Sequence, residues 1–231
     1  MNLAEYRSSN ARLADFLPWA ALVDEGIVLN KDGSFQRTAR FRGPDLDSAV
    51  PAELVAVAGR LNNALRRLGS GWALFVEAQR HAAGAYPPNS FPDAASALVD
   101  AERRAQFEEA GAHYESSYYL TLVYLPPAEG AALAERLLYE GSSRTVGADA
   151  RQMLAGFVDR TNRVLQLIEG FMPECGWLDD QETLTYLHST ISNKRHRVRV
   201  PEIPMYLDAL LADQPLTGGL EPMLGAAHLR V

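Results

Sequence analysis

A turn between two β-prone runs near the N-terminus constrains the fold more than any other feature of the chain. The run Gly26-Ile27-Val28-Leu29 precedes the turn residues Asn30-Lys31-Asp32-Gly33, and Phe35 to Phe41 follows them. Glycine readily adopts the positive φ angles that tight turns need. The pattern therefore predicts a β-hairpin. Since side chains alternate along a strand, the second strand of the hairpin should have one half-buried face and one solvated face. The half-buried face would carry Phe35, Arg37, Ala39 and Phe41, and the solvated face would carry Gln36, Thr38, Arg40 and Arg42.

Hydrophobic spacing and turn residues predict the elements that follow the hairpin. Ser48 is the predicted N-cap of the first helix, and Pro and Gly residues mark the loops. The expected elements are a helix over 51–68, a strand over 72–77, a loop over 86–92, a helix over 94–114, a strand over 117–125, and helices over 128–139, 149–171 and 181–192.

These elements predict an α+β fold with an N-terminal β-hairpin and a largely antiparallel mixed sheet, helices packed on one face, and a loop-rich C-terminal part. The strand over 117–125 is apolar on both faces, so it should be central in the sheet. Residues 227–231 resemble the start of a further strand. Three parts are expected: an apolar docking segment over 1–20, an α+β core over 21–175, and a helix with a loop-rich subdomain over 176–231, which should end where a longer chain would continue.

Composition excludes several classes of protein. The 231 residues are 47% hydrophobic and 22% charged, as in globular proteins, and the net charge of −7 argues against general nucleic-acid binding. The single cysteine, Cys175, rules out an intramolecular disulfide and is expected to be an inert structural thiol.

No apolar run approaches the roughly 20 residues that span a bilayer, and the N-terminus lacks a signal-peptide pattern. We expect a chain that is not secreted and does not cross a membrane by itself.

Motifs for hydrolytic chemistry are missing from the sequence. The only lysines, Lys31 and Lys194, do not follow glycine, so there is no phosphate-binding Gly-Lys-Ser/Thr loop. Neither a His-Glu-x-x-His motif nor a Gly-x-Ser-x-Gly motif occurs.

The pair Asp179-Asp180 could hold magnesium, but helix capping is the favoured interpretation. His188, on the apolar side of its helix, is interpreted as a core histidine bonded to a carbonyl. We expect no catalytic, cofactor-binding or metal site in this chain.

A basic run is one of two candidate contact sites. In a strand over residues 194–199, Arg195, Arg197 and Arg199 would share one face. Arginine rows can grip the phosphates of nucleic acid or of anionic lipid headgroups. More often they form a solvated strand edge, and that interpretation is favoured.

The other candidate is an apolar patch that precedes the hairpin and consists of Phe16, Leu17, Pro18 and Trp19, preceded by Leu13. The patch is too short to span a membrane. Packing on its own domain is the favoured interpretation. The alternative is that it docks on a membrane-embedded partner or at the bilayer interface, where tryptophan is common.

Several segments together resemble the N-terminal region of the TrbE-type conjugal transfer ATPases, in the CagE/TrbE/VirB family of type IV secretion components. The resemblance extends over nearly all of the chain. The segments that carry it are Leu17-Pro18-Trp19, Leu29 to Gln36, Arg40 to Leu46, Arg60 to Trp72, Leu120 to Pro127, Leu184 to His188 and Leu216 to Leu220.

The resemblance implies a role at the cytoplasmic side of a bacterial inner membrane. Full-length family members couple ATP hydrolysis, with magnesium, to assembly of a conjugative secretion channel and to transport through it. This chain would be their docking and assembly module, non-catalytic by itself, with inner-membrane components of the secretion system as partners and self-association open. Two alternatives remain: an arginine such as Arg195 or Arg197 could be supplied to an ATPase site, or the chain could be a nucleic-acid-binding adaptor.

Overall fold

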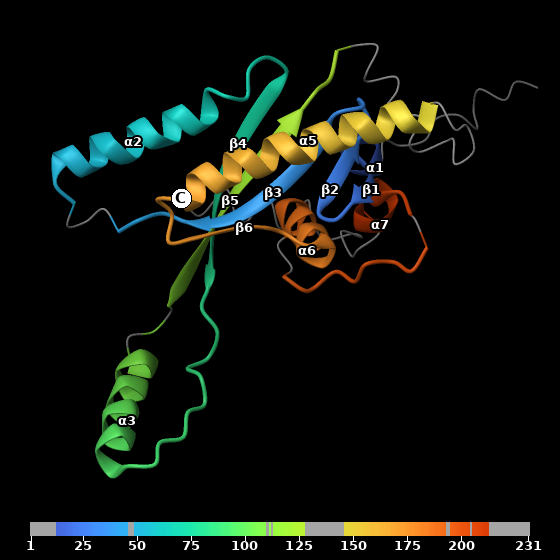
Figure 1. The fold of residues 1–231 in the computed structure, drawn as a ribbon. Helices are drawn as coiled ribbons and strands as arrows, with labels where there is room; N and C mark the ends of the chain where they lie inside the picture. The colour runs from blue at the N-terminus through green and yellow to red at the C-terminus, as the bar shows by residue number, and fades with distance from the viewer. Residues whose placement is uncertain are drawn as a thin grey trace, which may run out of the picture.

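The computed structural model describes residues 13–45, 49–109, 111, 113–127, 146–192, 195–203 and 205–212. Figure 1 shows the arrangement of the elements along the chain. Their bounds are α1 Leu13–Phe16, β1 Trp19–Asp24, β2 Ile27–Asn30, β3 Phe35–Arg42, α2 Pro51–Leu65, β4 Trp72–Ala82, α3 Ala94–Glu109, β5 Tyr114–Tyr124, α5 Val146–Glu169, β6 Glu174–Trp177, α6 Asp180–Ile191 and α7 Leu207–Ala212.

A six-stranded sheet runs through the molecule in the order β1-β2-β3-β5-β4, and β6 also pairs with β3. Every one of these pairings is antiparallel. The predicted α+β class and antiparallel sheet are confirmed, and β5 is central as expected, between β3 and β4. Strands β1 and β6 were not predicted, because the sequence of β1 was taken for an apolar segment and β6 has only four residues.

The predicted hairpin is formed by β2 and β3. The amide of Asn30 donates to the carbonyl of Ser34 at 2.8 Å, and Gly33 has a φ of 80°. The prediction of a solvated second face on β3 is wrong at Gln36 and Thr38, which are buried. The hydroxyl oxygens of Thr38 and of Thr121 on β5 are hydrogen-bonded at 2.9 Å. They lie on the face of the sheet that α6 covers. Sequence alternation does not reveal that both faces of a strand are covered.

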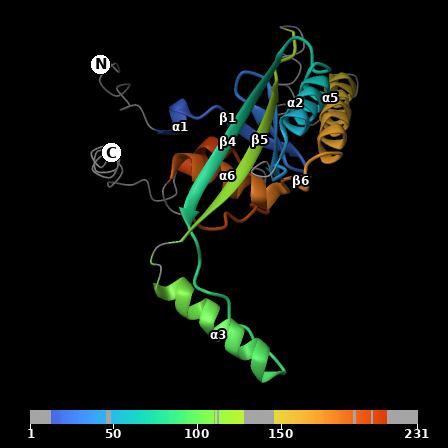
Figure 2. The same cartoon turned by 90° about the vertical axis from the view of Figure 1, so that its left-hand side faces the viewer.

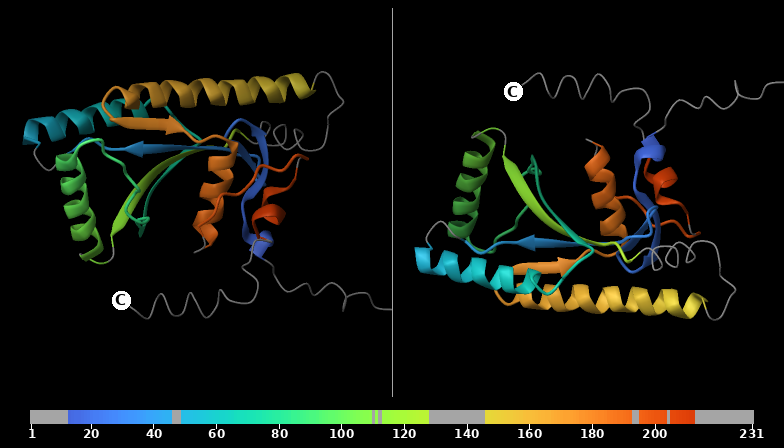
Figure 3. Two further views of the ribbon diagram at one scale, coloured as in Figure 1. Left: turned by 90° about the horizontal axis from the view of Figure 1, so that it is seen from below. Right: turned by 90° about the horizontal axis from the view of Figure 1, so that it is seen from above.

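Helices lie on both faces of the sheet, as the two views of Figure 3 show. On one face α2 and α5 pack over β5, in a core that includes Ala64, Leu122 and Val164. On the other face α6 and α7 pack against the first strands. The prediction that helices pack on one face only is wrong, because α6 covers the other face (Figure 3). The apolar side of α6 was predicted from its sequence, but which face of the sheet that side covers depends on packing with distant strands.

The boundaries of α2, α5 and α6 lie within about three residues of the expected ones, but the helix expected to reach residue 114 ends at Glu109, and β5 begins at Tyr114 rather than at residue 117. Helix α2 has Val50 at its N-cap, whereas the predicted cap Ser48 lies outside the described residues. The predicted helix over 128–139 and the predicted strand at 227–231 also lie outside them. Helix α6 begins after Asp179, as predicted from capping.

An arm projects from this body. Strands β4 and β5 pair along eleven residues each, and Figures 1 and 2 show that they carry α3 at their far end, away from the other helices. Helix α3 has no buried residue. The sequence predicted a strand of six residues for β4 and so did not predict the arm.

The N-terminal and C-terminal parts share one hydrophobic core. Leu17 and Trp19 belong to the same buried cluster as Leu178, Leu184 and Leu207. The expected boundary at 175/176 lies within β6. The division into three parts stays a prediction.

Candidate functional site

A polar cleft of about 370 Å³ lies between the sheet, α6 and the extended segment that follows α6. The sheet supplies its floor, α6 one wall, and residues 195–197 a second wall. Its lining residues are Arg40, Gln79, Tyr119, Leu178, Asp179, Gln181, Glu182, Thr185, Tyr186, Ser189, Arg195, His196 and Arg197.

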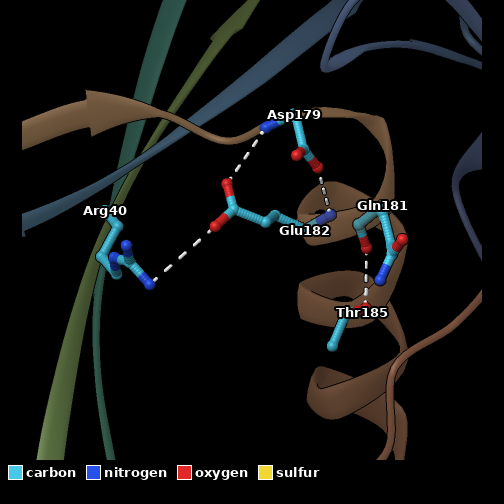
Figure 4. A network of polar contacts seen from close by, with 5 residues as sticks. All are labelled: Arg40, Asp179, Gln181, Glu182 and Thr185. Carbon is cyan, nitrogen blue, oxygen red and sulfur yellow. Dashed lines mark hydrogen bonds and ion pairs between the residues drawn. The ribbon is translucent and has the colours of Figure 1, made fainter.

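Two carboxylates at one end of the cleft cap the first turn of α6 by accepting hydrogen bonds from backbone amides (Figure 4). The side chain of Asp179 accepts from the amide of Glu182 at 2.7 Å, and Glu182 accepts from the amide of Asp179 at 3.2 Å. This reciprocal pair satisfies two backbone donors that a helix start leaves free. The prediction that Asp179 caps the helix is therefore confirmed.

Glu182 also approaches Arg40 of β3, with 4.0 Å between guanidinium nitrogen and carboxylate oxygen (Figure 4). Both side chains are exposed, so the pair contributes little stability. Deeper along the helix, Thr185 donates to the carbonyl of Gln181 at 2.7 Å. Arg40 is thus a lining residue of the cleft that is only loosely paired with Glu182.

The floor of the cleft is a hydrogen-bonded network between β4, β5 and α6. The side-chain amide of Gln79 donates to Glu77 at 2.8 Å and to Ser189 at 2.9 Å. The Tyr186 hydroxyl donates to the other carboxylate oxygen of Glu77 at 2.9 Å. Burial, followed by this carboxylate, raises the pKa of Tyr186, so the phenol stays protonated. Tyr119 packs on Tyr186 with 4.5 Å between the ring centres.

The basic run forms the second wall. The described residues 195–200 are extended but belong to no strand, so the predicted strand is not formed there; Lys194 lies outside the described residues. Val198 is buried, and its amide donates to the Thr185 hydroxyl at 3.1 Å, which fixes the segment against α6. Arg195 and Arg197 are exposed and line the cleft, whereas Arg199 is exposed but is not part of the lining.

His188 lies behind this wall. It is buried, as expected, with its ring centre 4.5 Å from that of His196. Among the described residues neither ring nitrogen has a hydrogen-bond partner, so the predicted carbonyl bond is not found. Burial and the nearby His196 lower the pKa of His188.

The apolar N-terminal patch is split by the fold. Leu17 and Trp19 are buried in the domain's own core, which fits the interpretation that they pack internally. Pro18 is exposed, and Phe16 has 72% of its surface exposed. Lys31 holds this region in place, because its ammonium donates to the Ala14 carbonyl at 2.7 Å and pairs with Asp208 at 2.9 Å.

Within the described residues, no three histidine, cysteine or acidic side chains gather as metal ligands would. Cys175 is a free thiol whose pKa rises to about 11, chiefly through burial and also through Glu169. No described helix is both long enough and apolar enough to cross a bilayer.

The cleft is suited to recognition of an anionic group. Arg40, Arg195 and Arg197 are among its lining residues, while both lining carboxylates accept hydrogen bonds from backbone amides at the start of α6. The two arginines of the run are evident in the sequence, but the floor of the cleft is not. The available signal is that Glu77 and Gln79, two residues apart on one face, follow the five apolar residues Trp72 to Val76.

Comparisons with known proteins agree on one family. The profile of the type IV secretion system ATPase VirB4/TrbE, N-terminal domain, matches residues 26–132. The chain is 34% identical over 245 residues to a conjugal transfer protein TrbE of Rhizobium radiobacter, covering 99% of this chain and 30% of that relative. It is 40% identical over 138 residues to the first part of a probable conjugal transfer protein TrbE of Sinorhizobium fredii (strain NBRC 101917 / NGR234), covering 58% of this chain and 93% of that relative. The chain thus spans about 30% of the length of the Rhizobium relative.

Proposed function

This chain belongs to the VirB4/TrbE family of type IV secretion ATPases, whose N-terminal domain it carries, and on that premise we propose that it acts as a docking and assembly module of the secretion machinery. Its partners are inner-membrane components of a conjugative type IV secretion system, and it works peripherally at the cytoplasmic face of that membrane. ATP and magnesium belong to the longer family protein, because this sequence has no Gly-Lys dipeptide.

The observation that carries the proposal is the arm. Helix α3 presents Leu98 and Val99, which are 72% and 52% exposed, at the far end of β4 and β5. Apolar side chains gathered on a projecting element are typical of a protein interaction site. A docking module needs such a surface held away from its own body.

Aromatic contacts hold α3 in a defined orientation. Phe107 stacks on His113 with 3.9 Å between ring centres and meets Tyr86 edge-on at 5.6 Å. The Tyr86 hydroxyl donates to Asp100 at 2.7 Å. A surface that is already ordered loses less conformational entropy on binding. The arm is therefore prepared for a partner.

Photo-crosslinking in donor cells tests the docking role. A photoreactive amino acid at Leu98 should crosslink this protein to an inner-membrane component of the secretion system. The same group at Ile203, which is 74% exposed on the body, serves as the matched control. Failure of Leu98 to crosslink above the Ile203 level would contradict docking through the arm.

Calorimetry tests whether the chain is non-catalytic alone. Titration of the purified chain with ATP and magnesium should give no binding heat. Saturable binding of ATP would overturn the proposal that this chain lacks a nucleotide site.

The cleft supports a second candidate function. Arg195 and Arg197 lie exposed along one wall, where they could supply an arginine to the ATPase site of the longer protein. In that case the double variant Arg195→Ala and Arg197→Ala in the longer protein should lower kcat for ATP hydrolysis and leave secretion partners bound. Unchanged kcat would remove this candidate. Binding of single-stranded DNA that is lost in the Arg195→Ala, Arg197→Ala, Arg199→Ala variant would instead favour an adaptor role.

A further inference from the structure

The strands at the two ends of the path β1-β2-β3-β5-β4 differ in how they are protected. Strand β1 forms one edge, where its pairing with β2 has two register shifts and α7 packs beside it. Strand β4 forms the other edge, and its pairing with β5 runs without a shift from Trp72 to Ala82. Irregular pairing and a covering helix are ways in which proteins prevent strand addition. Among the described elements, β4 has neither.

The backbone groups of β4 that face outward can be assigned from the ends of the strand. The Gly71 carbonyl accepts from Leu125 at 2.8 Å, and the Ala83 amide donates to His113 at 2.8 Å. Hydrogen-bonded and non-hydrogen-bonded residues alternate in an antiparallel pair. The odd-numbered residues of β4 therefore bond to β5, and the even-numbered ones, including Leu74 and Val76, direct their amides and carbonyls away from the sheet.

The first five residues of this edge, Trp72 to Val76, are apolar. Leu74, Phe75 and Val76 are 38%, 59% and 70% exposed. No charged residue occurs between Gly71 and Val76. A regular edge with an uncharged stretch is a template for another strand, whereas Glu77 and Arg80 put charges only on the later part of β4.

We propose that β4 pairs with β4 of a second copy of this chain, antiparallel and with Phe75 on the two-fold axis, so that two sheets join into one. This register opposes Leu74 to Val76 and Ala73 to Glu77. The two Phe75 rings then form a cross-strand pair, the type of contact that stabilises sheets. The proposal is independent of the docking function of the arm.

The charge pattern favours this pairing and this register. Registers centred on Glu77 or Arg80 would place like charges directly opposite each other, which destabilises a sheet. The register centred on Phe75 opposes no like charges and gathers the three exposed apolar residues at the centre. A two-fold pairing also satisfies both edges at once, because the same surface is used by both copies.

Disulfide formation tests the register directly. Two Phe75 residues on the axis form a non-hydrogen-bonded pair with Cα atoms about 4.5 Å apart, which a disulfide can bridge. In a Cys175→Ser background, Phe75→Cys should form a covalent dimer rapidly with oxidised glutathione as the oxidant. Ala73→Cys alone should not, since two copies of residue 73 would be about 13 Å apart. A mixture of Ala73→Cys and Glu77→Cys chains should crosslink.

The control is Val55→Cys on α2, which at 73% exposure is at least as accessible as Phe75 at 59%. If Phe75→Cys crosslinks no faster than Val55→Cys, or if Ala73→Cys crosslinks with itself as fast as Phe75→Cys, the proposed pairing is refuted.

Sedimentation equilibrium gives a second measurement. The unmodified chain should be dimeric at concentrations of tens of micromolar, and Val76→Lys should raise the dimer Kd by at least about tenfold. Leu98→Lys, at an equally exposed position on α3, should leave the Kd unchanged. A monomeric unmodified chain, or equal effects of both variants, would overturn the proposal whether or not the arm docks on the secretion system.

Discussion

The guanidinium of Arg37 lies over the ring of Trp177, with 4.3 Å from its central carbon to the ring centre. Both side chains donate to the same acceptor, the side-chain oxygen of Asn162, at 2.8 Å and 2.9 Å. This contact joins β3, β6 and α5 on one face of the sheet. A shared acceptor makes the three elements depend on one side chain of α5.

We predict that Asn162→Ala destabilises the protein by about 1–3 kcal/mol, because two partly buried donors lose their acceptor. Urea unfolding followed by circular dichroism measures the change. Asn63→Ala, at an exposed position of α2, is the control and should change stability by less than about 0.5 kcal/mol. Equal stability of the two variants would contradict the role of Asn162.

Removal of the Tyr186 hydroxyl should destabilise the root of the arm. Tyr186→Phe leaves Glu77 with one fewer donor and interrupts the path from Glu77 to Thr121, whose hydroxyl lies 3.4 Å from that of Tyr186. We expect a loss of about 1–2 kcal/mol, together with faster amide hydrogen exchange in β4. The exposed Tyr206→Phe should behave as the unmodified protein. Unaltered exchange in β4 would argue against a link between α6 and the arm.

Gly26→Ala should be among the most damaging single changes. Gly26 has a φ of 64°, and its amide donates to Asp180 at 2.7 Å. An added Cβ would collide with the backbone carbonyl oxygen of Leu178. We predict a loss of more than about 2 kcal/mol, measured by thermal and urea unfolding.

The control for this change is Gly59→Ala in α2, where an added Cβ meets nothing within 4 Å. That variant should be stabilised by about 0.5–1 kcal/mol through helix propensity. A tolerated Gly26→Ala would mean that the turn between β1 and β2 can move away from α6.

His188 should make stability depend on pH. The unfolded chain protonates this residue near pH 6.5, but burial and His196 lower its pKa in the folded chain. Below about pH 6.5 the unfolded state therefore binds more protons, and stability falls as pH falls, by up to about 1.4 kcal/mol per pH unit until the folded pKa is reached.

Urea unfolding at pH 7.5 and pH 5.5 measures this slope. In the His188→Leu variant, the part of the pH dependence of stability that comes from His188 should disappear. In the His113→Gln variant, which changes a histidine on the arm, that part should remain. An unchanged slope in His188→Leu would assign the pH dependence to other groups.

The Cys175 thiol should react slowly. Because its pKa is raised to about 11, little thiolate is present at pH 8. Reaction with a thiol-specific reagent should be at least about tenfold slower in the folded chain than in urea. Glu169→Gln removes the negative charge near the thiol and should accelerate the reaction. Equal rates in the folded and unfolded chains would show that Cys175 is not protected.

Local patterns predicted much of the fold. The turn residues before Gly33, the apolar spacing of α5 and the cap at Asp179 each depend on interactions within a few residues, so the sequence alone locates them. The four residues of β6 could not be predicted in this way. That strand exists because β3 offers it a free edge between Ala39 and Arg42.

The candidate site was only partly predictable. Arg195 and Arg197 form a visible charge pattern, but the strand expected for them does not form, because Val198 is anchored to α6 through Thr185. The floor of the cleft joins Gln79 to Ser189, which are 110 residues apart. Contacts at that separation leave no local pattern in the sequence.

The sequence by itself determined the family, the hairpin and the helices, since each is encoded by neighbouring residues. Only the tertiary structure decided that α6 covers the second face of the sheet, that Leu17 and Trp19 are buried while Phe16 is not, and that β4 becomes an unprotected edge. The physical reason is that burial and edge exposure depend on which distant segments pack together, and that packing is a property of the whole folded chain.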